Sequence, residues 1–467
     1  PFMAYGGDLA PKGVPSSANF CMNGIIAADR TLKPHAYEVK RVYQNIAFRL
    51  ADYHEGLVEL QNKYFFKDLK DFNFYWKLEG NGEELAKGQI ENVALAPQQK
   101  AIFRTSFPKV TPAPGVEYFV RFYACLKNDE GLLKANTELA DAQAELPFYQ
   151  PLQAAKQAGK VDMKQTAERL SLSANGSEVE FDKANGALCS WKQAGKEWIK
   201  SPLLPNFWRP VTDNDMGNGM NRTLRAWREA GKNARLEEMT HHALNEGGYE
   251  VVSTYRLDSV AGSTFKITYR MQSRGCLDVE CLFIPANDTL PLMPRMGVSV
   301  GLAREASQMS WLGRGPHENY CDRNTSAYVG LYHGAVKDEC YLYDRPQENG
   351  NKTDVRWMSL TDAQGAGLMA IGQPFLSTSA WPYDPASLDE PGLRKSQRHQ
   401  SDVRESDVIT WNLDLKQMGV GGDTSWGAFP HQQYLIPAER QSFSFRLCPA
   451  RSADGAAEGK QYLNMKP

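Results

Sequence analysis

A glycine-rich loop near the end of the chain carries one tryptophan, Trp426. The loop reads Gly419-Val420-Gly421-Gly422-Asp423-Thr424-Ser425-Trp426. Because glycine reaches backbone conformations that are closed to other residues, such a loop can push an aromatic ring outward into a cleft. An exposed indole there could cover the apolar face of a sugar. The alternative is a ring that plugs the loop into its own core, since tryptophan is highly buried on average.

A second run of reactive side chains is His317-Glu318-Asn319-Tyr320. A histidine beside a carboxylate could open and close a sugar ring by general acid–base catalysis, and His399 offers a second histidine for that chemistry. The neighbouring charged residues favour a different role, a network of ion pairs, because structural networks also gather titratable groups. These neighbours are Arg314, Asp322 and Arg323.

Other acidic residues are assigned structural roles. Asp423 is expected to bond backbone amides and so shape its glycine-rich loop, as short acidic side chains do in turns. Asp213 and Asp215 follow Arg209 closely, which predicts another ion-pair network. Glu348 precedes Asn349-Gly350 and is interpreted as the flank of a turn.

Length and charge exclude several classes of protein. The chain has 467 residues, more than one hydrophobic core usually supports, so two to four units of roughly 100 to 200 residues each are expected. Its 53 basic and 55 acidic residues leave a formal charge of -2, so no global field recruits nucleic acid or anionic membrane. No apolar stretch of about 18 residues occurs. We therefore expect a neutral or small ligand.

Eight cysteines are scattered along the chain, at positions 21, 125, 189, 276, 281, 321, 340 and 448. They form no Cys-x-x-Cys pair and show no histidine spacing suited to zinc. Buried free thiols are the favoured interpretation. Disulfides remain an alternative if the protein is exported. Eight cysteines in a chain of this size are, however, fewer than in small domains stabilised mainly by disulfides.

The first third of the chain changes from a loop-rich opening to short strands. Pro34 can start a helix, in which Ala36, Val39, Val42, Tyr43 and Ile46 recur near helical spacing, and one face of it should pack on something upstream. About a hundred residues of short apolar runs at regular turns then predict an immunoglobulin-like β-sandwich. Residues 147–159, which mix Pro, Gln, Ala and Lys, are interpreted as a linker.

Strands dominate the remainder of the chain. Alternating apolar residues recur at Val179 and Phe181, at 264–269 and at 277–281, and one helix is expected between Asn221 and Gly231. Roughly 280 residues of strands without a second clear linker predict one large antiparallel sandwich.

Five groups of short strings extend this interpretation, because they resemble, in the same order, the large bacterial β-galactosidases of glycoside hydrolase family 2. They are Tyr5-Gly6-Gly7-Asp8 with Asn19-Phe20-Cys21-Met22-Asn23-Gly24 and Ala28-Asp29-Arg30; Arg209-Pro210-Val211-Thr212-Asp213-Asn214-Asp215; Trp311-Leu312-Gly313-Arg314-Gly315-Pro316-His317-Glu318-Asn319-Tyr320 with Asp322-Arg323; Gln347-Glu348-Asn349-Gly350; and the Trp426 loop. The resemblance covers nearly the whole chain, except the connector around 150–165 and the tail after Cys448.

The resemblance implies that different residues of the site bind the sugar, bind metal ions and carry out catalysis. It implies that Trp426 reaches into the active site beneath the sugar, and that Phe20 and Asn23 bind sodium through a backbone carbonyl and a side-chain oxygen, which hard cations accept. A turn in which Asn23 bonds its own backbone is the alternative. Ser16 stands where the family often has Asn, which puts any secondary metal contact there in doubt. The family's two catalytic glutamates and its magnesium ligands lie upstream of Tyr5, so no catalytic residue is assigned to this chain.

These observations predict a mainly β chain of five parts. Residues 1–46 are the terminal segment of a (β/α)8 TIM barrel, 47–148 an immunoglobulin-like β-sandwich, 149–165 a linker, 166–450 a galactose mutarotase-like β-supersandwich and 451–467 a tail. The resemblance implies a retaining hydrolase of β-galactosides such as lactose that forms a homo-oligomer. Because the first residues read as the middle of a fold, we expect further sequence upstream, and a cytoplasmic or periplasmic location is left open.

Two other classes of function remain as alternatives. One is a carbohydrate-binding or assembly module without catalysis, which an authentic start near Pro1 would favour. The other is an aldose mutarotase, which requires His317 or His399 to meet a carboxylate in an open cleft.

Overall fold

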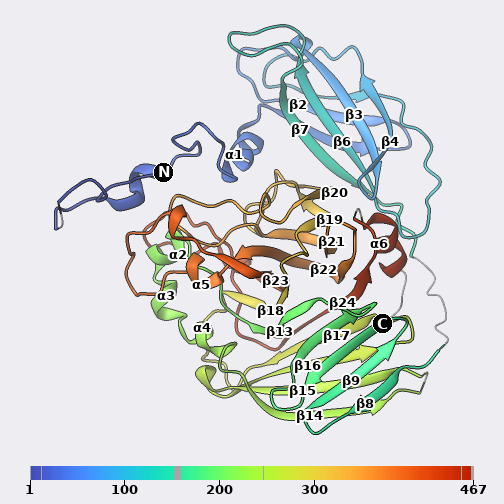
Figure 1. Cartoon of the computed structure of the whole chain (residues 1–467). Helices are drawn as coiled ribbons and strands as arrows, with labels where there is room; N and C mark the ends of the chain where they lie inside the picture. Colours follow the sequence, from blue (N-terminus) through green and yellow to red (C-terminus); the bar gives the residue numbers. More distant parts are fainter. Residues whose placement is uncertain (1, 12, 152–158, 246, 454, 464–467) are drawn as a thin grey trace.

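The computed structural model describes residues 2–11, 13–151, 159–245, 247–453 and 455–463. The chain is mainly β, with two β-sandwich bodies and a loop-rich opening segment, residues 2–44, that runs between them (Figure 1). The expected fold class is thereby confirmed. Within the described residues, no helix is both long and apolar enough to cross a membrane.

The opening segment contains little regular structure. A 3-10 helix, η1, spans Ala18–Met22, and α1 spans His35–Tyr43 after Pro34, as the helix-start signal predicts. Only Ala36 of α1 is buried, whereas Val42 and Tyr43 are 62% and 77% exposed. The apolar face of α1 is therefore largely uncovered by the described residues.

The immunoglobulin-like sandwich consists of two antiparallel sheets, of order β1-β2-β5 and β4-β3-β6-β7. The strands are β1 (Ile46–Asp52), β2 (Leu57–Asn62), β3 (Phe72–Gly80), β4 (Glu83–Ile90), β5 (Lys100–Arg104), β6 (Tyr118–Leu126) and β7 (Glu138–Leu146), with η2 at Leu69–Asp71. The alternation of Phe72, Phe74 and Trp76 predicts a strand with one buried face, and in β3 all three are buried. Their rings form one core with residues of both sheets.

The predicted linker is only partly described. Residues 152–158 lie outside the described residues, but residues 162–165 of the interval 149–165 form strand β8 (Asp162–Gln165), which pairs with β9. Strand β8 belongs to a sheet of order β12-β11-β10-β9-β8. The other strands are β9 (Arg169–Ala174), β10 (Ser177–Asp182), β11 (Leu188–Gln193) and β12 (Lys196–Glu197). The lack of apolar alternation in β8 is explained by its place at the edge of this sheet.

A large curled antiparallel sheet forms the rest of the supersandwich. Its main path is β13-β18-β23-β22-β24-β17-β16-β15-β14, and β21 joins β19 and β20 to β22. The bounds are β13 (Ile199–Asn206), β14 (Arg235–Ala243), β15 (Tyr249–Leu257), β16 (Ser263–Met271), β17 (Leu277–Ile284), β18 (Arg295–Ala303), β19 (Gln308–Gly315), β20 (Tyr328–Ala335), β21 (Lys352–Thr361), β22 (Gly367–Tyr383), β23 (Glu405–Gln417) and β24 (Gln441–Ala450). Its core is continuous with that of the β8–β12 sheet, so residues from 162 onward form one sandwich.

Short helices interrupt the sandwich. The single helix expected between Asn221 and Gly231 is instead two short ones, α3 and α4, preceded by α2, because Gly219 in the left-handed region ends α2 and the chain turns again at Leu224. The helices are α2 (Asp213–Asn218), α3 (Met220–Thr223), α4 (Ala226–Ala230), α5 (Pro385–Leu388) and α6 (Ala456–Leu463), with 3-10 turns η3 (Asp258–Val260), η4 (Gln400–Asp402) and η5 (Gln432–Tyr434). Helix α6 falls in the predicted tail, of which residues 454 and 464–467 lie outside the described residues.

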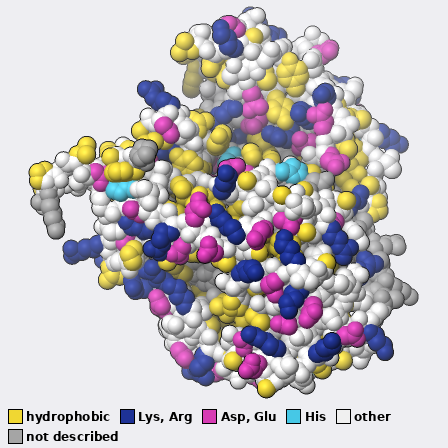
Figure 2. Space-filling model, in the orientation of Figure 1, with side chains coloured by type: hydrophobic (Ala, Val, Ile, Leu, Met, Phe, Trp, Pro, Cys, Tyr) yellow, Lys and Arg dark blue, Asp and Glu magenta, His cyan; other side chains and the backbone are white. Residues whose placement is uncertain are grey.

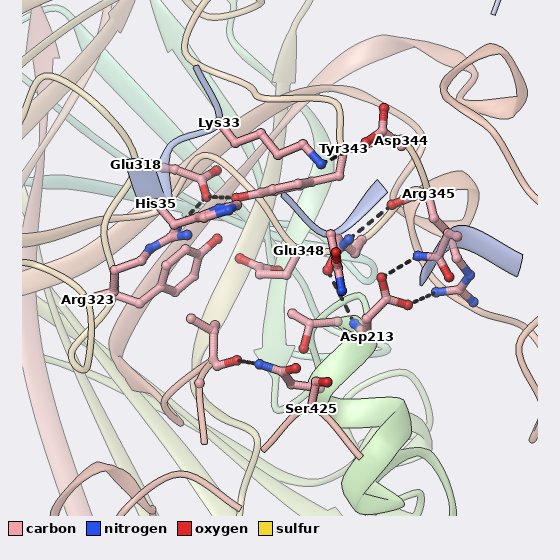
Figure 3. A pocket seen from close by; sticks show the side chains of 18 of the residues that line it. Lys33, His35, Asp213, Glu318, Arg323, Tyr343, Asp344, Arg345, Glu348 and Ser425 are labelled. Atoms are coloured by element: carbon pink, nitrogen blue, oxygen red, sulfur yellow. Dashed lines mark hydrogen bonds and ion pairs between the residues drawn. The ribbon is translucent and has the colours of Figure 1, made fainter. Parts of the chain in front are cut away.

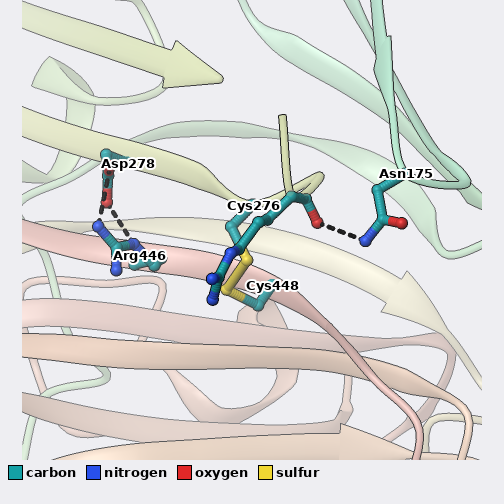
Figure 4. Close-up of a disulfide and its surroundings, with 6 residues drawn as sticks. Asn175, Cys276, Asp278, Arg446 and Cys448 are labelled. Atoms are coloured by element: carbon teal, nitrogen blue, oxygen red, sulfur yellow. Dashed lines mark hydrogen bonds and ion pairs between the residues drawn. A yellow bond between two sulfur atoms is a disulfide. The ribbon is translucent and has the colours of Figure 1, made fainter. Parts of the chain in front are cut away.

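Two cysteines correct the expectation of free thiols. Cys276 and Cys448 form a disulfide with a Cα–Cα distance of 4.4 Å (Figure 4). They stand opposite each other because β17 and β24 pair with Leu277 against Leu447, which places the two cysteines as the next cross-strand pair. Their separation of 172 residues hides this pairing from the sequence. Among the other six, only Cys281 is fully buried.

Candidate functional site

A cavity of about 520 Å³ opens where the opening segment crosses the supersandwich (Figure 3). The opening segment and loops of the supersandwich supply its walls, and five carboxyl groups and three permanent cations line it. The carboxyl groups are those of Asp213, Glu318, Asp322, Asp344 and Glu348. The cations are Lys33, Arg323 and Arg345. Such a concave site with many fixed polar groups suits a small polar ligand.

Buried polar contacts attach the opening segment to the supersandwich. The Lys33 ammonium donates to the Met22 carbonyl and forms an ion pair of 2.9 Å with Asp344, and both side chains are about 95% buried. The Asn19 amide donates to Asp213 at the start of α2, at 2.6 Å. These contacts fix the turn that follows η1 against the cavity wall.

Phe20 and Asn23, the residues predicted to bind sodium, lie inside η1 and directly after it. Asn23 is exposed, lines the cavity and makes no hydrogen bond through its side chain to any described residue. Phe20, inside η1, is 60% exposed. Neutral oxygens of this kind fit a monovalent hard cation, although no group of three or more His, Cys, Asp or Glu side chains suited to a metal occurs among the described residues.

Trp426 projects from the loop between β23 and β24 with 74% of its surface exposed, so its ring is not packed in the loop's own core. Its neighbour Ser425 lines the same cavity as Asn23. A Cβ at Gly217 in α2 would lie 2.3 Å from the Ser425 carbonyl oxygen, so α2 touches the Trp426 loop while its first residue, Asp213, holds Asn19. Helix α2 therefore joins the two predicted halves of the site.

The role assigned to Asp423 is wrong. Its carboxylate contacts the exposed side chain of His431, at 2.9 Å. The loop amides of Val420 and Gly421 donate instead to Asp322, at 3.1 and 2.7 Å. Asp322 is about a hundred residues away in the sequence, and no local pattern reveals this contact.

Glu318 lies at the centre of a buried network, as the ion-pair interpretation predicts. Its carboxylate accepts from the Arg323 guanidinium at 2.6 Å, from the Tyr343 hydroxyl at 2.5 Å and from the Gly350 amide at 2.7 Å. The ion pair of Arg209 with Asp215, at 3.0 Å and fully buried, is confirmed in the same way. The Glu318 carboxylate therefore accepts three hydrogen bonds within the protein.

His317 does not meet Glu318. Its ring nitrogen contacts the Ser326 hydroxyl at 2.9 Å, and its face stacks on Tyr37 of α1 with ring centroids 4.6 Å apart. Burial lowers the pKa of His317 to about 4, and the charges of Lys352 and Arg323 lower it further, so the ring is neutral at pH 7. His317 therefore joins the opening segment to the supersandwich.

Glu348 is not the solvent-exposed flank of a turn. It is 2% exposed, lies 3.3 Å from the Arg295 guanidinium and accepts from the Gln417 amide at 3.0 Å. Burial raises the pKa of Glu348, and it raises that of Asp414, on the other side of Arg295, to about 8. Gly350 takes a φ angle of 74°, as an Asn-Gly pair favours, but residues 349–350 form no assigned turn, and nothing in the local sequence shows that Glu348 is buried.

His399 does contact a carboxylate, but outside the cavity. Its Nε2 lies 2.8 Å from Asp8, whose carboxylate also accepts from the Tyr5 amide and from Gln397. The ring stacks on Tyr5. None of these residues lines the cavity, and the group fastens the start of the opening segment to η4.

Sequence reasoning missed several lining residues, among them Lys33, Tyr343, Asp344 and Arg345. Arg345 is fully buried and pairs with Glu390. Lys33 precedes Pro34 and looks like an ordinary surface lysine before a helix. The only available signal was the cluster Tyr341-Leu342-Tyr343-Asp344-Arg345, in which aromatic and charged residues alternate.

Three protein-family models match the chain in succession. Residues 1–48 match the TIM barrel domain of glycosyl hydrolases family 2, residues 58–147 match domain 4 of β-galactosidase, and residues 173–447 match the β-galactosidase small chain. The last match covers more than half of the chain. The cavity lies between the first and the third of these regions.

Curated relatives agree with the family models. The chain is 34% identical to a β-galactosidase of Priestia megaterium over 96% of its own length, and 32% identical to one of Lactobacillus delbrueckii subsp. bulgaricus over 94%. It spans 42% of the length of each. Among solved structures, a galactose 1-epimerase from Lactobacillus acidophilus superposes with a TM-score of 0.33 at 10% identity, over 64% of this chain and all of that one.

Proposed function

This chain belongs to the family of the β-galactosidase small chain, and we propose on that basis that it forms the carboxyl-terminal part of a retaining β-galactosidase. Its role is to complete the sugar site. One observation carries the proposal: a single polar cavity is lined by Asn23 and by Ser425, the neighbour of the exposed Trp426, although some 400 residues separate them. The substrate class is terminal β-galactosides, lactose among them.

Catalysis itself is assigned to residues upstream. Retaining hydrolysis takes two carboxyl groups about 5 Å apart, one as nucleophile and one as acid and then base. In this cavity Glu318 is held by Arg323 and Tyr343, and Glu348 by Arg295, which suits them to structural roles. In the order of the family's motifs, the two catalytic glutamates precede Tyr5. We therefore propose that this chain alone does not hydrolyse galactosides.

The residues of this chain bind and orient the sugar. The Trp426 indole covers its apolar face, while its hydroxyl groups keep hydrogen bonds to the polar walls. The Phe20 carbonyl and the Asn23 side-chain oxygen would hold a sodium ion, which would supply a positive charge for hydroxyl oxygens of the sugar. Magnesium in the complete enzyme takes its ligands from the upstream part.

The opening segment supports an upstream barrel as a partner. Of the twenty exposed large hydrophobic residues in the described chain, ten lie between Phe2 and Tyr43. Hydrophobic side chains are prominent on this projecting segment in Figure 2. Exposed apolar patches mark interaction sites, and a terminal barrel segment would bury these residues against the rest of its barrel.

The alternatives are less well supported. A mutarotase needs a histidine and a carboxylate in an open cleft, but His317 faces Ser326 and Tyr37, and the pair of His399 with Asp8 lies outside the cavity. A carbohydrate-binding module without catalysis would use the same Trp426. An upstream reading frame that encodes two barrel glutamates distinguishes the enzyme from that module.

Hydrolysis of a chromogenic β-galactoside by the purified chain tests the proposal, with and without an amino-terminal portion of a related enzyme. We expect no activity from the chain alone and activity after mixing. Activity from the chain alone would show that catalytic carboxylates lie within it. A mixture that forms a complex but stays inactive would favour the binding module.

A further inference from the structure

The base of the Trp426 loop is held by charged side chains from two other parts of the supersandwich. Asp322, in the connection between β19 and β20, accepts the amides of Val420 and Gly421 with its two carboxylate oxygens, at 3.1 and 2.7 Å. Bonds from backbone amides to a carboxylate are charge-assisted and roughly twice as strong as neutral ones. One side chain therefore fixes the orientation of two consecutive peptide groups.

Arg209 holds the residues just before them. Its guanidinium donates to the carbonyl of Met418 and, at 2.8 Å, to that of Gly419. Asp215 fixes the guanidinium from the other side, and both side chains are at least 99% buried. Because Asp215 lies in α2, the base of the loop is fastened to the helix that also touches Ser425 and Asn19.

Glycines allow the loop backbone to lie close to these side chains, because they carry no Cβ. A Cβ at Gly419 would lie 2.6 Å from the Asp322 carboxylate, and one at Gly422 would lie 2.7 Å from the Ala428 carbonyl oxygen. Neither residue has a positive φ angle. The prediction that these glycines supply unusual backbone conformations is therefore wrong for both. Their function is to let the loop lie directly on the carboxylate.

We propose that Asp322 is the positioning residue for Trp426: its carboxylate holds the loop in the conformation in which Ser425 lines the cavity and the adjacent indole stays exposed. Asp322 and Gly421 line the sugar cavity next to Ser425, so a released loop would also open the cavity wall. The inference rests on the proposed role of Trp426 in sugar binding. Asp322 acts through the loop, and no contact between Asp322 and the sugar is required.

Fluorine NMR of the chain labelled with 5-fluorotryptophan tests the proposal. The chain has ten tryptophans, and Trp426 alone is exposed while the other nine are buried or half-buried. The variant Trp426→Phe identifies its resonance. In Asp322→Ala we expect that resonance to shift or broaden while the other nine stay in place. In Asp322→Asn, which keeps one oxygen acceptor, we expect a smaller change of the same resonance.

Asp423→Ala is the matched control, because it removes an exposed carboxylate from the same loop. It should leave the Trp426 resonance where it is. An unchanged Trp426 resonance in Asp322→Ala would overturn the proposal. So would a displacement of all ten resonances in both Asp322 variants, because Asp322 would then support the whole fold.

Titration with methyl β-galactoside separates this inference from the proposed function. If Trp426 contacts sugar, the sugar moves its resonance in the unmodified chain. If the sugar does not, the sugar-binding role fails, while the comparison of Asp322 variants still decides the positioning role. In the reassembled enzyme, Asp322→Ala should raise KM about ten-fold and change kcat less, whereas Asp423→Ala should change neither.

Discussion

The opening segment and the Trp426 loop face each other across one cavity, but they are held in opposite ways. The segment buries few large apolar side chains and exposes ten of them, and a few polar contacts such as that of Lys33 with Asp344 attach it to the supersandwich. The loop has an exposed tip, but its base is fixed by buried or half-buried charges that belong to the same body.

This difference predicts which half of the site would gain order from the proposed upstream barrel. The surface of the segment is apolar, so its order should increase when another surface covers it. The loop is fastened by Asp322 and Arg209, both within the supersandwich, and needs no such cover. The half of the site that carries Asn23 should therefore respond to the proposed upstream barrel, and the half that carries Trp426 should not.

The largest effect is expected from the buried ion pair that attaches the segment. Lys33→Met leaves Asp344 buried without its cation, and removal of one partner of a buried pair costs roughly 3 to 5 kcal/mol. The segment should detach locally while the sandwiches stay folded. Hydrogen exchange measured by mass spectrometry should then speed up in residues 18–43 and nowhere else.

Lys40→Met is the control for that substitution. Lys40 lies on α1 in the same segment, but its partner Glu138 and its own side chain are 33% and 53% exposed, so its loss should change little. Equal hydrogen-exchange rates of residues 18–43 in the Lys33→Met and Lys40→Met variants would mean that Lys33 does not attach the segment.

The next effect concerns the loop. Trp426→Ala in the reassembled enzyme should weaken substrate capture by about 1 to 3 kcal/mol, the scale of a lost aromatic platform. We expect this weakening to appear as a higher KM for a chromogenic β-galactoside. Phe66→Ala, which removes a fully exposed ring in the immunoglobulin-like sandwich, should leave KM unchanged. If KM stays the same in both variants, Trp426 does not contact the substrate.

The same two regions show how far sequence reasoning reaches. Trp426 and Asn23 could be singled out because short strings around them match a family, and the strands could be predicted because their alternation is local. Asp322, Lys33 and Asp344 could not, since their roles arise from contacts across about a hundred or more residues. Glu348 was misjudged for the same reason. An Asn-Gly pair is visible in the local sequence, whereas the burial of Glu348 depends on distant partners, Arg295 and Gln417.

A pH-dependent effect is expected at His317, where the opening segment meets the supersandwich. Its pKa of about 4 in the folded chain lies below the ordinary 6.5, so the unfolded chain takes up a proton first as the pH falls. The neutral ring's contribution is present above pH 6.5 and is lost between pH 6.5 and 4. Because the ring is only partly buried, we expect the free energy of unfolding to fall by about 1 to 2 kcal/mol over this pH range.

His317→Gln removes this titration and can keep a hydrogen bond to Ser326. Relative to the unmodified chain, the variant should gain stability between pH 6.5 and 4, measured as the midpoint of urea unfolding. His431→Gln, at an exposed histidine of the loop, serves as the control. A constant difference between His317→Gln and the unmodified chain across that range would show that His317 does not stay neutral in the fold.

The smallest effect is expected at the tip of the loop, and it separates the tip from the base. Asp423 and His431 lie 2.9 Å apart, but their side chains are 80% and 58% exposed, and exposed pairs contribute only about 0 to 1 kcal/mol. Asp423→Asn should therefore leave both the unfolding midpoint and KM close to those of the unmodified protein. If it raises KM as much as Asp322→Ala does, the loop is held at its tip and Asp322 is not the positioning residue. If KM rises only for Asp322→Ala, the base of the loop alone determines where Trp426 stands.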